Sequence, residues 1–406
     1  MEVLFSAGGS VTAPKGFMAG AAMAGVKKAG RYDVTVVSAD GPAAIAAVFT
    51  TNKVKAAPVL VSQEHLGTMG GQGRAAVFNS GCANACTGEQ GLADARQMAE
   101  ACAAAIGCKP QEVLVASTGV IGAYLPMEKV LPGISESCAG LSAENGGLAA
   151  KAIMTTDTFA KEAATTVEVA GHKITLGAMA KGSGMIHPNM ATLLAMVTTD
   201  CAIMPALLQK ALLAAAEATF NMVTVDGDTS TNDCLFAIAN GQAGNPMLCG
   251  EDAPGYAEFA RALTGICRHL AQMIAKDGEG ATKFLTVRVE GVKTEADARL
   301  AAKTIAGSAL VKAAIYGKDA NWGRILCALG YSGADFDPAL VDMYLGPVQM
   351  MDKGRALLFD EAAAAAYLAK DEILAVVCLN QGEETATAWG CDLTHAYVTI
   401  NADYRS

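Results

Sequence analysis

At 406 residues, with 52% hydrophobic and only 5% aromatic side chains, the chain is too long for one simple core, and we expect connected layers or lobes of α/β or α+β type. Its formal net charge of −10 and the absence of any large basic cluster make nucleic acid a poor candidate partner. No run of about 18 apolar residues could span a membrane, and the N-terminus lacks a basic region followed by a long apolar run, so we expect a cytoplasmic protein.

The first half of the chain alternates short apolar runs, typical of strands, with helical patterns. A helix at 89–106 should end at Gly107, because glycine is the usual residue just past a helix. Gly171 and His172 divide the run 165–177, which predicts a hairpin. The other elements expected here are strands at 34–38, 44–50, 74–78 and 112–116 and a helix at about 143–154.

The second half continues the alternation, with helices expected to follow the apolar periodicity and strands to follow β-branched runs. Because hairpins occur beside helical connections, the sequence predicts a mixed sheet rather than a purely parallel one. The elements expected here are helices at 205–220, 257–276 and 294–305 and strands at 222–225, 284–289, 373–379 and 396–401.

The stretch 181–200 changes character at its middle. Residues 181–189 are rich in glycine and polar side chains, as in a tight loop, whereas 192–199 have the composition of a buried strand. At the join, the Thr192 hydroxyl could attack the carbonyl of Ala191 and cut the chain. The freed α-amine, with an ordinary pKa of about 7.7 to 8.0, would then serve as a base for the same hydroxyl. The plainer interpretation is that Thr192 begins a strand.

Three further groups suit a site that handles an amino acid. Thr118 and Gly119 follow the expected strand at 112–116, where they could stabilise an oxyanion or simply form a turn. The ammonium group of Lys181, in the loop, would suit a substrate carboxylate, although most lysines are simply solvated. Glu279, between two glycines, could project into a cleft and pair with a substrate ammonium. The run 277–283 lacks the spacing of a phosphate loop.

Other patterns argue against metal and disulfide chemistry. The acidic run 226–233 begins like a calcium loop, but the position that needs a bidentate acid is Ala237, so we predict a polar turn near the site and no metal. Twelve cysteines occur without a CxxC motif. We expect reduced, buried thiols, and name as examples Cys102, Cys267, Cys327 and Cys378. No G-x-S-x-G elbow accompanies the histidines, so His187, near the join, should have a structural or hydrogen-bonding part.

The segment GSGMIHPNMATLLAMVTTD, residues 182–200, closely resembles the self-cleavage segment of the glutamate N-acetyltransferase/ornithine acetyltransferase family of arginine biosynthesis. Similar motifs at 10–17, 79–88, 277–283 and 316–324 and in the C-terminal tail extend the resemblance over the whole chain. It implies a cut between Ala191 and Thr192, giving fragments 1–191 and 192–406. It also implies an N-terminal-nucleophile-like α/β sandwich of mixed sheets between helices, assembled as a heterotetramer of two copies of each fragment.

The resemblance also assigns roles to individual residues. It gives Thr118 and Gly119 the oxyanion hole and makes Thr192 the nucleophile. At the last residue, Ser406 stands where many members of the family end in threonine. The substrate-binding positions that the resemblance implies are Thr155, Lys181, Thr192, Glu279, Asn401 and Ser406.

The implied reaction is acetyl transfer from N-acetylornithine to glutamate through acetyl-Thr192, with ping-pong kinetics. It requires no cofactor, and acetyl-CoA is a second acetyl donor in some members of the family. Two rivals stay open. An amidase or aminopeptidase of related fold would release acyl-Thr192 to water, and a non-catalytic small-molecule binding protein would keep an intact chain.

Overall fold

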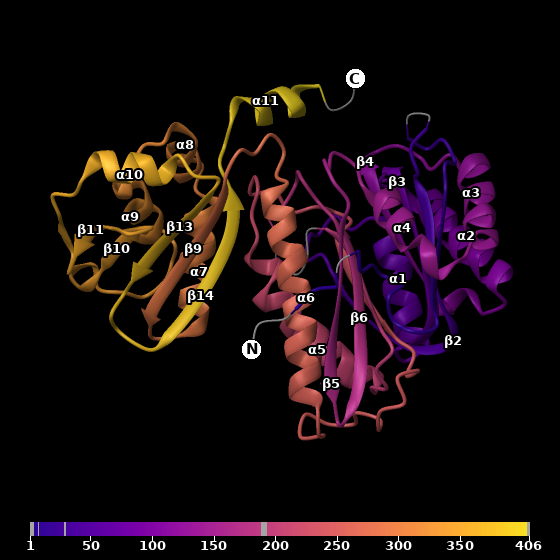
Figure 1. The fold of residues 1–406 in the computed structure, drawn as a ribbon. Coiled ribbons are helices and arrows are strands. Elements are labelled where there is room, and N and C mark those ends of the chain that lie inside the picture. The colour runs from indigo at the N-terminus through magenta and orange to yellow at the C-terminus, as the bar shows by residue number, and fades with distance from the viewer. Residues whose placement is uncertain (1–3, 7, 28–29, 188–192, 404–406) are drawn as a thin grey trace. The chain divides into compact units, whose positions relative to one another are not determined.

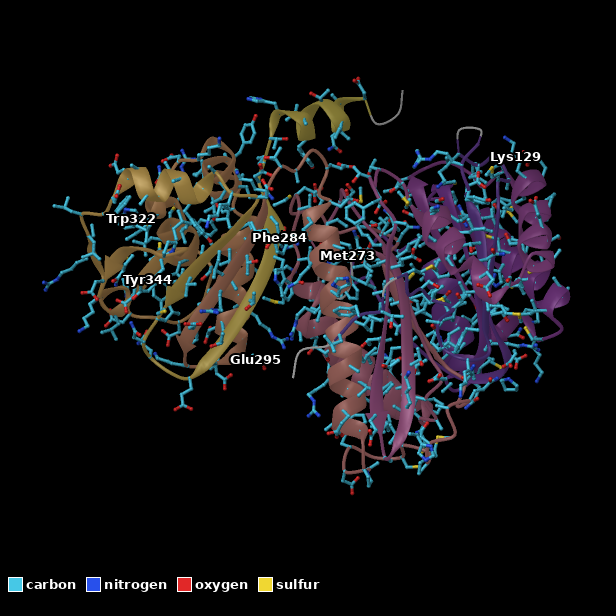
Figure 2. All side chains as sticks on the ribbon, viewed as in Figure 1. Lys129, Met273, Phe284, Glu295, Trp322 and Tyr344 are labelled. Carbon is cyan, nitrogen blue, oxygen red and sulfur yellow. The ribbon has the colours of Figure 1, made fainter. Side chains whose placement is uncertain are left out.

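The computed structural model describes residues 4–6, 8–27, 30–187 and 193–403 (Figure 1). It divides into two compact units, and the chain passes between them several times. The first unit comprises Met1–Gly182, Pro188–Asn221 and Thr229–Leu270, and the second comprises Ser183–His187, Met222–Asp228 and Ala271–Ser406. Side chains from the strands and their covering helices fill the interior of each unit (Figure 2).

The first unit is built on a mixed sheet with the strand order β4-β3-β2-β8-β7-β6-β5, and β1 pairs with β2. The pairs β3–β4 and β7–β8 are parallel, whereas β1–β2, β2–β3, β2–β8, β5–β6 and β6–β7 are antiparallel. This confirms the mixed architecture. Its strands are β1 (Phe17–Ala22), β2 (Val34–Phe49), β3 (Gln72–Cys82), β4 (Val113–Val120), β5 (Lys161–Val169), β6 (His172–Lys181), β7 (Leu194–Thr199) and β8 (Cys234–Ala239).

The middle of this sheet is buried on both faces, and every residue of the adjacent strands β7 and β8 is buried. Val36, Val77 and Val115 pack on one face with residues of α2 and α3, while Phe78 and Phe236 lie in a second cluster with residues of α4. The helices of this part of the chain are α1 (Ala57–Thr68), α2 (Gly88–Ile106), α3 (Met127–Ala139), α4 (Gly146–Ile153), α5 (Pro205–Ala218) and α6 (Tyr256–Lys276), the last of which continues into the second unit.

Local signals place several of these elements correctly. Helix α2 ends at Gly107 with φ of 71°, the left-handed conformation that glycine adopts easily. Strands β5 and β6 are joined by Ala170 and Gly171, both with positive φ, as a tight two-residue hairpin requires. The strands expected at 34–38 and 44–50 are one strand, β2, with a register break between Ser38 and Ala43.

The second unit contains another mixed sheet, with the strand order β12-β11-β10-β13-β9-β14. Strands β9 and β13 are parallel, and α7 buries a face rich in alanine against β9 and β14. The strands are β9 (Phe284–Val292), β10 (Asp342–Leu345), β11 (Val348–Asp352), β12 (Arg355–Ala356), β13 (Glu372–Cys378) and β14 (Glu384–Cys391). The helices are α7 (Glu295–Gly307), α8 (Ala309–Gly317), α9 (Trp322–Gly330), α10 (Glu361–Leu368) and α11 (His395–Ala402).

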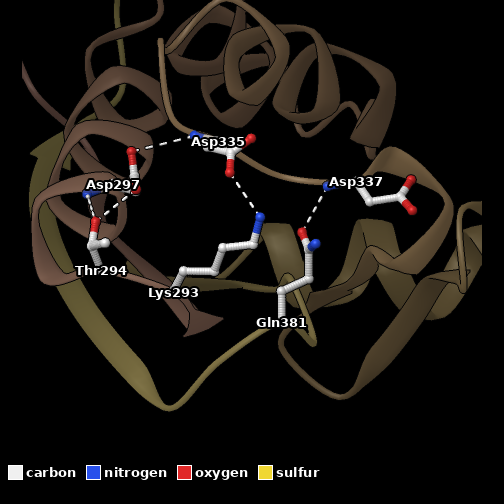
Figure 3. A network of polar contacts seen from close by, with 6 residues as sticks. All are labelled: Lys293, Thr294, Asp297, Asp335, Asp337 and Gln381. Carbon is white, nitrogen blue, oxygen red and sulfur yellow. Dashed lines mark hydrogen bonds and ion pairs between the residues drawn. The ribbon is translucent and has the colours of Figure 1, made fainter.

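A polar network fixes the start of α7 (Figure 3). Thr294 caps the helix by accepting a hydrogen bond from the Asp297 N–H at 3.1 Å. The neighbouring Lys293 pairs with Asp335 at 2.7 Å, and the Asp335 N–H donates to Asp297. These contacts hold the loop before β10 and include none of the residues predicted to bind substrate, so we interpret them as structural.

The structure contradicts several expectations. Residues 396–401 form helix α11 rather than a strand, and 222–225 are not a strand either, since Val223 makes only an isolated bridge to Trp389. The predicted helix at 143–154 is a short 3-10 turn followed by α4. All twelve cysteines are unpaired, as expected, but Cys327 is exposed and Cys378 is only partly buried. Within the described ranges, no helix has the length and apolar character needed to cross a membrane.

Candidate functional site

Thr118 and Gly119 belong to β4 itself, not to a turn after it. Thr118 pairs with Ser80 and Gly119 with Gly81, at a point where the β3–β4 register is irregular. Gly119 has φ of 134°, and a Cβ there would lie 2.3 Å from the Gly81 carbonyl carbon. Only glycine fits this close backbone approach, which the sequence could not reveal because it depends on the neighbouring strand.

A buried polar group lies beside this bulge. The amide of Asn232 donates to the carbonyls of Ser117 at 2.8 Å and Ala83 at 2.6 Å, and so ties β4 to the run 226–233. The next residue, Asp233, is buried, and this burial raises the pKa of its carboxyl well above the usual range. Its Oδ2 has no hydrogen-bond partner within the described part of the chain. The polar turn predicted at 226–233 therefore includes a buried end.

Lys181 is the last residue of β6 rather than part of a loop, and it is only 8% exposed. Its neighbour Gly182 donates its N–H to Asp157 Oδ1 at 2.7 Å, and the Thr155 N–H donates to Asp157 Oδ2 at 2.9 Å. Asp157 thus connects the segments that carry two of the predicted substrate-binding residues. Its side chain is fully buried and pairs with that of Lys161, also fully buried, at 2.6 Å.

The electrostatics of Asp157 follow from these neighbours. Burial alone would raise the pKa of this carboxyl, but the charges of Lys181 and Lys161 and the hydrogen bonds from Lys161 and Gly182 outweigh it and lower the pKa to about 2. Asp157 is therefore ionised at neutral pH. Sequence reasoning missed it, although the acid stands in the same short segment as Thr155.

Glu279 and Asn401 lie together in the second unit. The Asn401 amide donates to Glu279 Oε2 at 2.8 Å, from the exposed helix α11. The Glu279 N–H donates to the Ser183 carbonyl at 3.0 Å, and its side chain is largely buried rather than projecting freely. The prediction of a strand at 396–401 was wrong, yet Asn401 does lie beside another predicted substrate-binding residue.

His187 hydrogen-bonds through Nδ1 to the Thr224 hydroxyl at 2.9 Å. Burial, with a smaller contribution from the charge of Lys303, lowers the pKa of this imidazole to about 4. A neutral ring with a fixed hydrogen bond agrees with the hydrogen-bonding part expected of it.

Three predicted positions, Ala191, Thr192 and Ser406, lie outside the described residues. Leu193, the next described residue, lies directly before β7, and its carbonyl accepts a hydrogen bond from the Cys234 N–H at 2.9 Å. Among the residues that are described, no group of three or more His, Cys, Asp or Glu side chains could hold a metal ion.

Comparison with known proteins gives concordant results. The ArgJ family model matches residues 18–406. The arginine biosynthesis bifunctional protein ArgJ of Symbiobacterium thermophilum is 56% identical over 98% of this chain and 99% of its own, and that of Caldanaerobacter subterraneus is 50% identical over 100% of both. A crystal structure of the Bacillus halodurans ArgJ protein is 48% identical, with a TM-score of 0.50, and covers 51% of this chain and 97% of its own. The chain therefore belongs to the ArgJ family.

Proposed function

We propose that the protein is a bifunctional acetyltransferase of arginine biosynthesis, which moves an acetyl group from N-acetylornithine to glutamate and also accepts one from acetyl-CoA. The observation that carries the proposal is membership of the ArgJ family along almost the whole chain, with relatives named as bifunctional arginine biosynthesis proteins. The local geometry supports it, because Thr155 is joined to the end of β6 through Asp157, and Glu279 to Asn401 directly.

The precursor cuts itself between Ala191 and Thr192. The threonine hydroxyl adds to the alanine carbonyl, the peptide C–N bond breaks as the nitrogen becomes a free amine, and water hydrolyses the resulting ester to leave a carboxylate on Ala191. In support, the solved Bacillus halodurans chain aligns over nearly all of its length to about half of this chain, which is the size of one fragment.

The fragments 1–191 and 192–406 stay associated after the cut. The pairs β6–β7 and β2–β8 each join a strand from one fragment to a strand from the other. Two copies of each fragment form the heterotetramer. The compact units do not follow the fragment boundary, since each contains residues from both sides of it.

In the transfer, the freed α-amine of Thr192 accepts the hydroxyl proton while the oxygen attacks the acetyl carbonyl of N-acetylornithine. Thr118 and Gly119 stabilise the oxyanion. The C–N bond breaks, ornithine leaves with the proton on its nitrogen, and the acetyl group remains as an ester on Thr192. The neutral amine of glutamate then attacks this ester, the bond between the acetyl carbon and the Thr192 oxygen breaks, the proton lost by the amine returns to that oxygen through the α-amine, and N-acetylglutamate leaves. Lys181 binds the α-carboxylate and Glu279 a substrate ammonium, with Thr155, Asn401 and Ser406 as further contacts.

The exchange requires no cofactor, because the acetyl carbon keeps its oxidation state and amide and ester carbonyls serve as donors in turn. Acetyl-CoA is a second donor substrate whose thioester reacts with the same hydroxyl. Formation of N-acetylglutamate from acetyl-CoA and glutamate, without N-acetylornithine, tests this second activity.

Intact mass with N-terminal sequencing tests the cut. Purified protein should give two fragments of similar size, one beginning at Thr192, whereas Thr192→Ala should give one full-length band without acetyl transfer. Thr192→Ser, which keeps a hydroxyl, is the matched control and should still cut. Active protein with an unbroken chain would contradict the mechanism.

Incubation with N-acetylornithine, with and without glutamate, separates transfer from hydrolysis. Transfer predicts that sustained ornithine release requires glutamate and yields an equal amount of N-acetylglutamate. Release that is indifferent to glutamate would favour the amidase or aminopeptidase alternative.

A further inference from the structure

The residues just before the proposed cut are held by an acidic side chain with no role in the reaction above. We call Ser183–His187 the upstream segment. Asp226 Oδ2 accepts the Met185 N–H at 2.6 Å, and its Oδ1 accepts the Ile186 N–H at 2.9 Å. The Val225 N–H donates to the Ile186 carbonyl at 2.6 Å. The backbone of the segment is therefore bound on both its donor and acceptor sides.

The conformation of Met185 indicates that Asp226 is needed there. Met185 has φ of 55°, in the left-handed region that residues with a side chain seldom occupy. Met185 is 43% exposed, so burial contributes little to holding it in this conformation. Consecutive N–H groups that converge on one carboxylate form a charge-assisted anion nest, and this stabilises the unusual turn.

The same carboxylate faces the C-terminal helix. The Tyr397 hydroxyl donates to Asp226 Oδ2 at 3.3 Å. Burial and then the charge of Asp226 raise the pKa of Tyr397, so its hydroxyl keeps the proton that it donates. One turn later on the same face of α11, Asn401 bonds Glu279. None of the described residues of α11 is buried, so polar contacts such as these hold the helix.

Glu279 contacts both the upstream segment and α11, the two elements that Asp226 also binds. Its N–H bonds the Ser183 carbonyl, and its carboxylate packs on Gly184 so closely that a Cβ at 184 would lie 2.3 Å from the carboxyl carbon. On its other side it accepts the Asn401 amide.

We propose that Asp226 is a positioning residue, which binds the upstream segment and α11 together and so fixes the Glu279 carboxylate where it receives the substrate ammonium. The inference rests on the proposed substrate role of Glu279. A turn that is only structural would affect stability when altered, but not the KM of folded, cut enzyme.

The test compares steady-state KM and kcat for N-acetylornithine in cut, folded enzyme. Asp226→Asn keeps the shape and one acceptor oxygen but removes the charge, and Tyr397→Phe removes only the link to α11. A charge-assisted hydrogen bond corresponds to roughly a tenfold change in binding. We expect KM to rise about tenfold in Asp226→Asn and about threefold in Tyr397→Phe, with kcat changing less than KM in both.

Asp228→Asn is the matched control, because Asp228 is an exposed acid in the same turn and contacts Asp226 through its backbone N–H, at 3.3 Å, which the substitution keeps. Its KM should equal that of the unaltered enzyme. Unchanged KM in both Asp226→Asn and Tyr397→Phe would overturn the inference. Glu279→Gln tests the underlying assignment separately: unchanged KM there would remove the role of Glu279, and absence of transfer in the unaltered protein would remove the proposed function.

Discussion

Replacing Asp157 by alanine should be among the most damaging single changes in the first unit. The variant leaves the Lys161 ammonium, which is fully buried, without the carboxylate that lies 2.6 Å from it. Breaking a buried ion pair by removing one partner costs about 3–5 kcal/mol, because the remaining charge stays in a poorly solvating interior. The N–H groups of Thr155 and Gly182 also lose their acceptor, at about 1–3 kcal/mol for each group that stays buried. We therefore expect Asp157→Ala to lower the free energy of unfolding by at least about 4 kcal/mol.

Two comparisons make this prediction specific. The double variant Asp157→Leu, Lys161→Met replaces the pair by apolar side chains, and it should recover much of the loss because the buried ammonium of Lys161 is removed together with its carboxylate partner. Recovery should be incomplete, since the two N–H groups still lack an acceptor. Glu64→Ala breaks a comparable ion pair with Arg96, at 2.9 Å, whose side chains are about half exposed, and it should cost no more than about 1 kcal/mol.

The assay is equilibrium denaturation in urea, carried out in the Thr192→Ala background. An uncut chain keeps both fragments in one molecule, so unfolding does not separate them, and free energies measured at one protein concentration can be compared between variants. The reasoning would be refuted if Asp157→Ala were no more destabilising than Glu64→Ala, or if the double variant were no more stable than the single one.

Three further predictions concern other parts of the chain. The folded protein lowers the pKa of His187 to about 4, so at acidic pH the unfolded chain takes up a proton that the folded one excludes, and the free energy of unfolding should fall as pH drops from about 6.5 to about 4. His187→Asn should make the melting temperature depend less on pH over that range. A pH profile of the melting temperature that is the same in the variant would refute the lowered pKa of His187. Gly119→Ala places a Cβ against the backbone of Gly81 and should abolish cutting and transfer, which a gel and an ornithine-release assay would detect, whereas normal activity would show that the bulge tolerates a side chain. Phe236→Ala removes a buried ring packed between two other aromatic rings and should cost about 3–5 kcal/mol by denaturation, with a value below about 1 kcal/mol contradicting its place in the core.

Much of the fold could be predicted from local chemistry. The hairpin at Gly171 and the end of α2 at Gly107 follow from residues that adopt positive φ, and the buried strands follow from apolar, β-branched runs. Helix α11 could not be predicted in this way, because its valine, threonine and isoleucine favour a strand. The residues form a helix instead, and polar contacts join it to distant residues, as between Asn401 and Glu279. Tertiary contacts of this kind outweigh weak local propensity.

The candidate site divides in the same way. Motif resemblance predicted substrate contacts for Thr155, Lys181, Glu279 and Asn401. The structure connects these residues in two pairs, one through Asp157 and one directly. The role of Asp157 could not be predicted from the sequence, because its partner Gly182 stands 25 residues further along the chain. The contact exists only when the end of β6 lies beside the loop that carries Asp157. The two pairs lie in separate units, a division that no local pattern indicated.

The pairing of β6 with β7 affects how the mature protein refolds after denaturation. A newly made chain closes this sheet within a single molecule, whereas the products of the proposed cut, once unfolded, would have to find each other in solution to rebuild it. Recovery from denaturation should then depend more steeply on protein concentration in the cut form than in the Thr192→Ala precursor. Maturation would in this way fix the order of events, with assembly first and scission second.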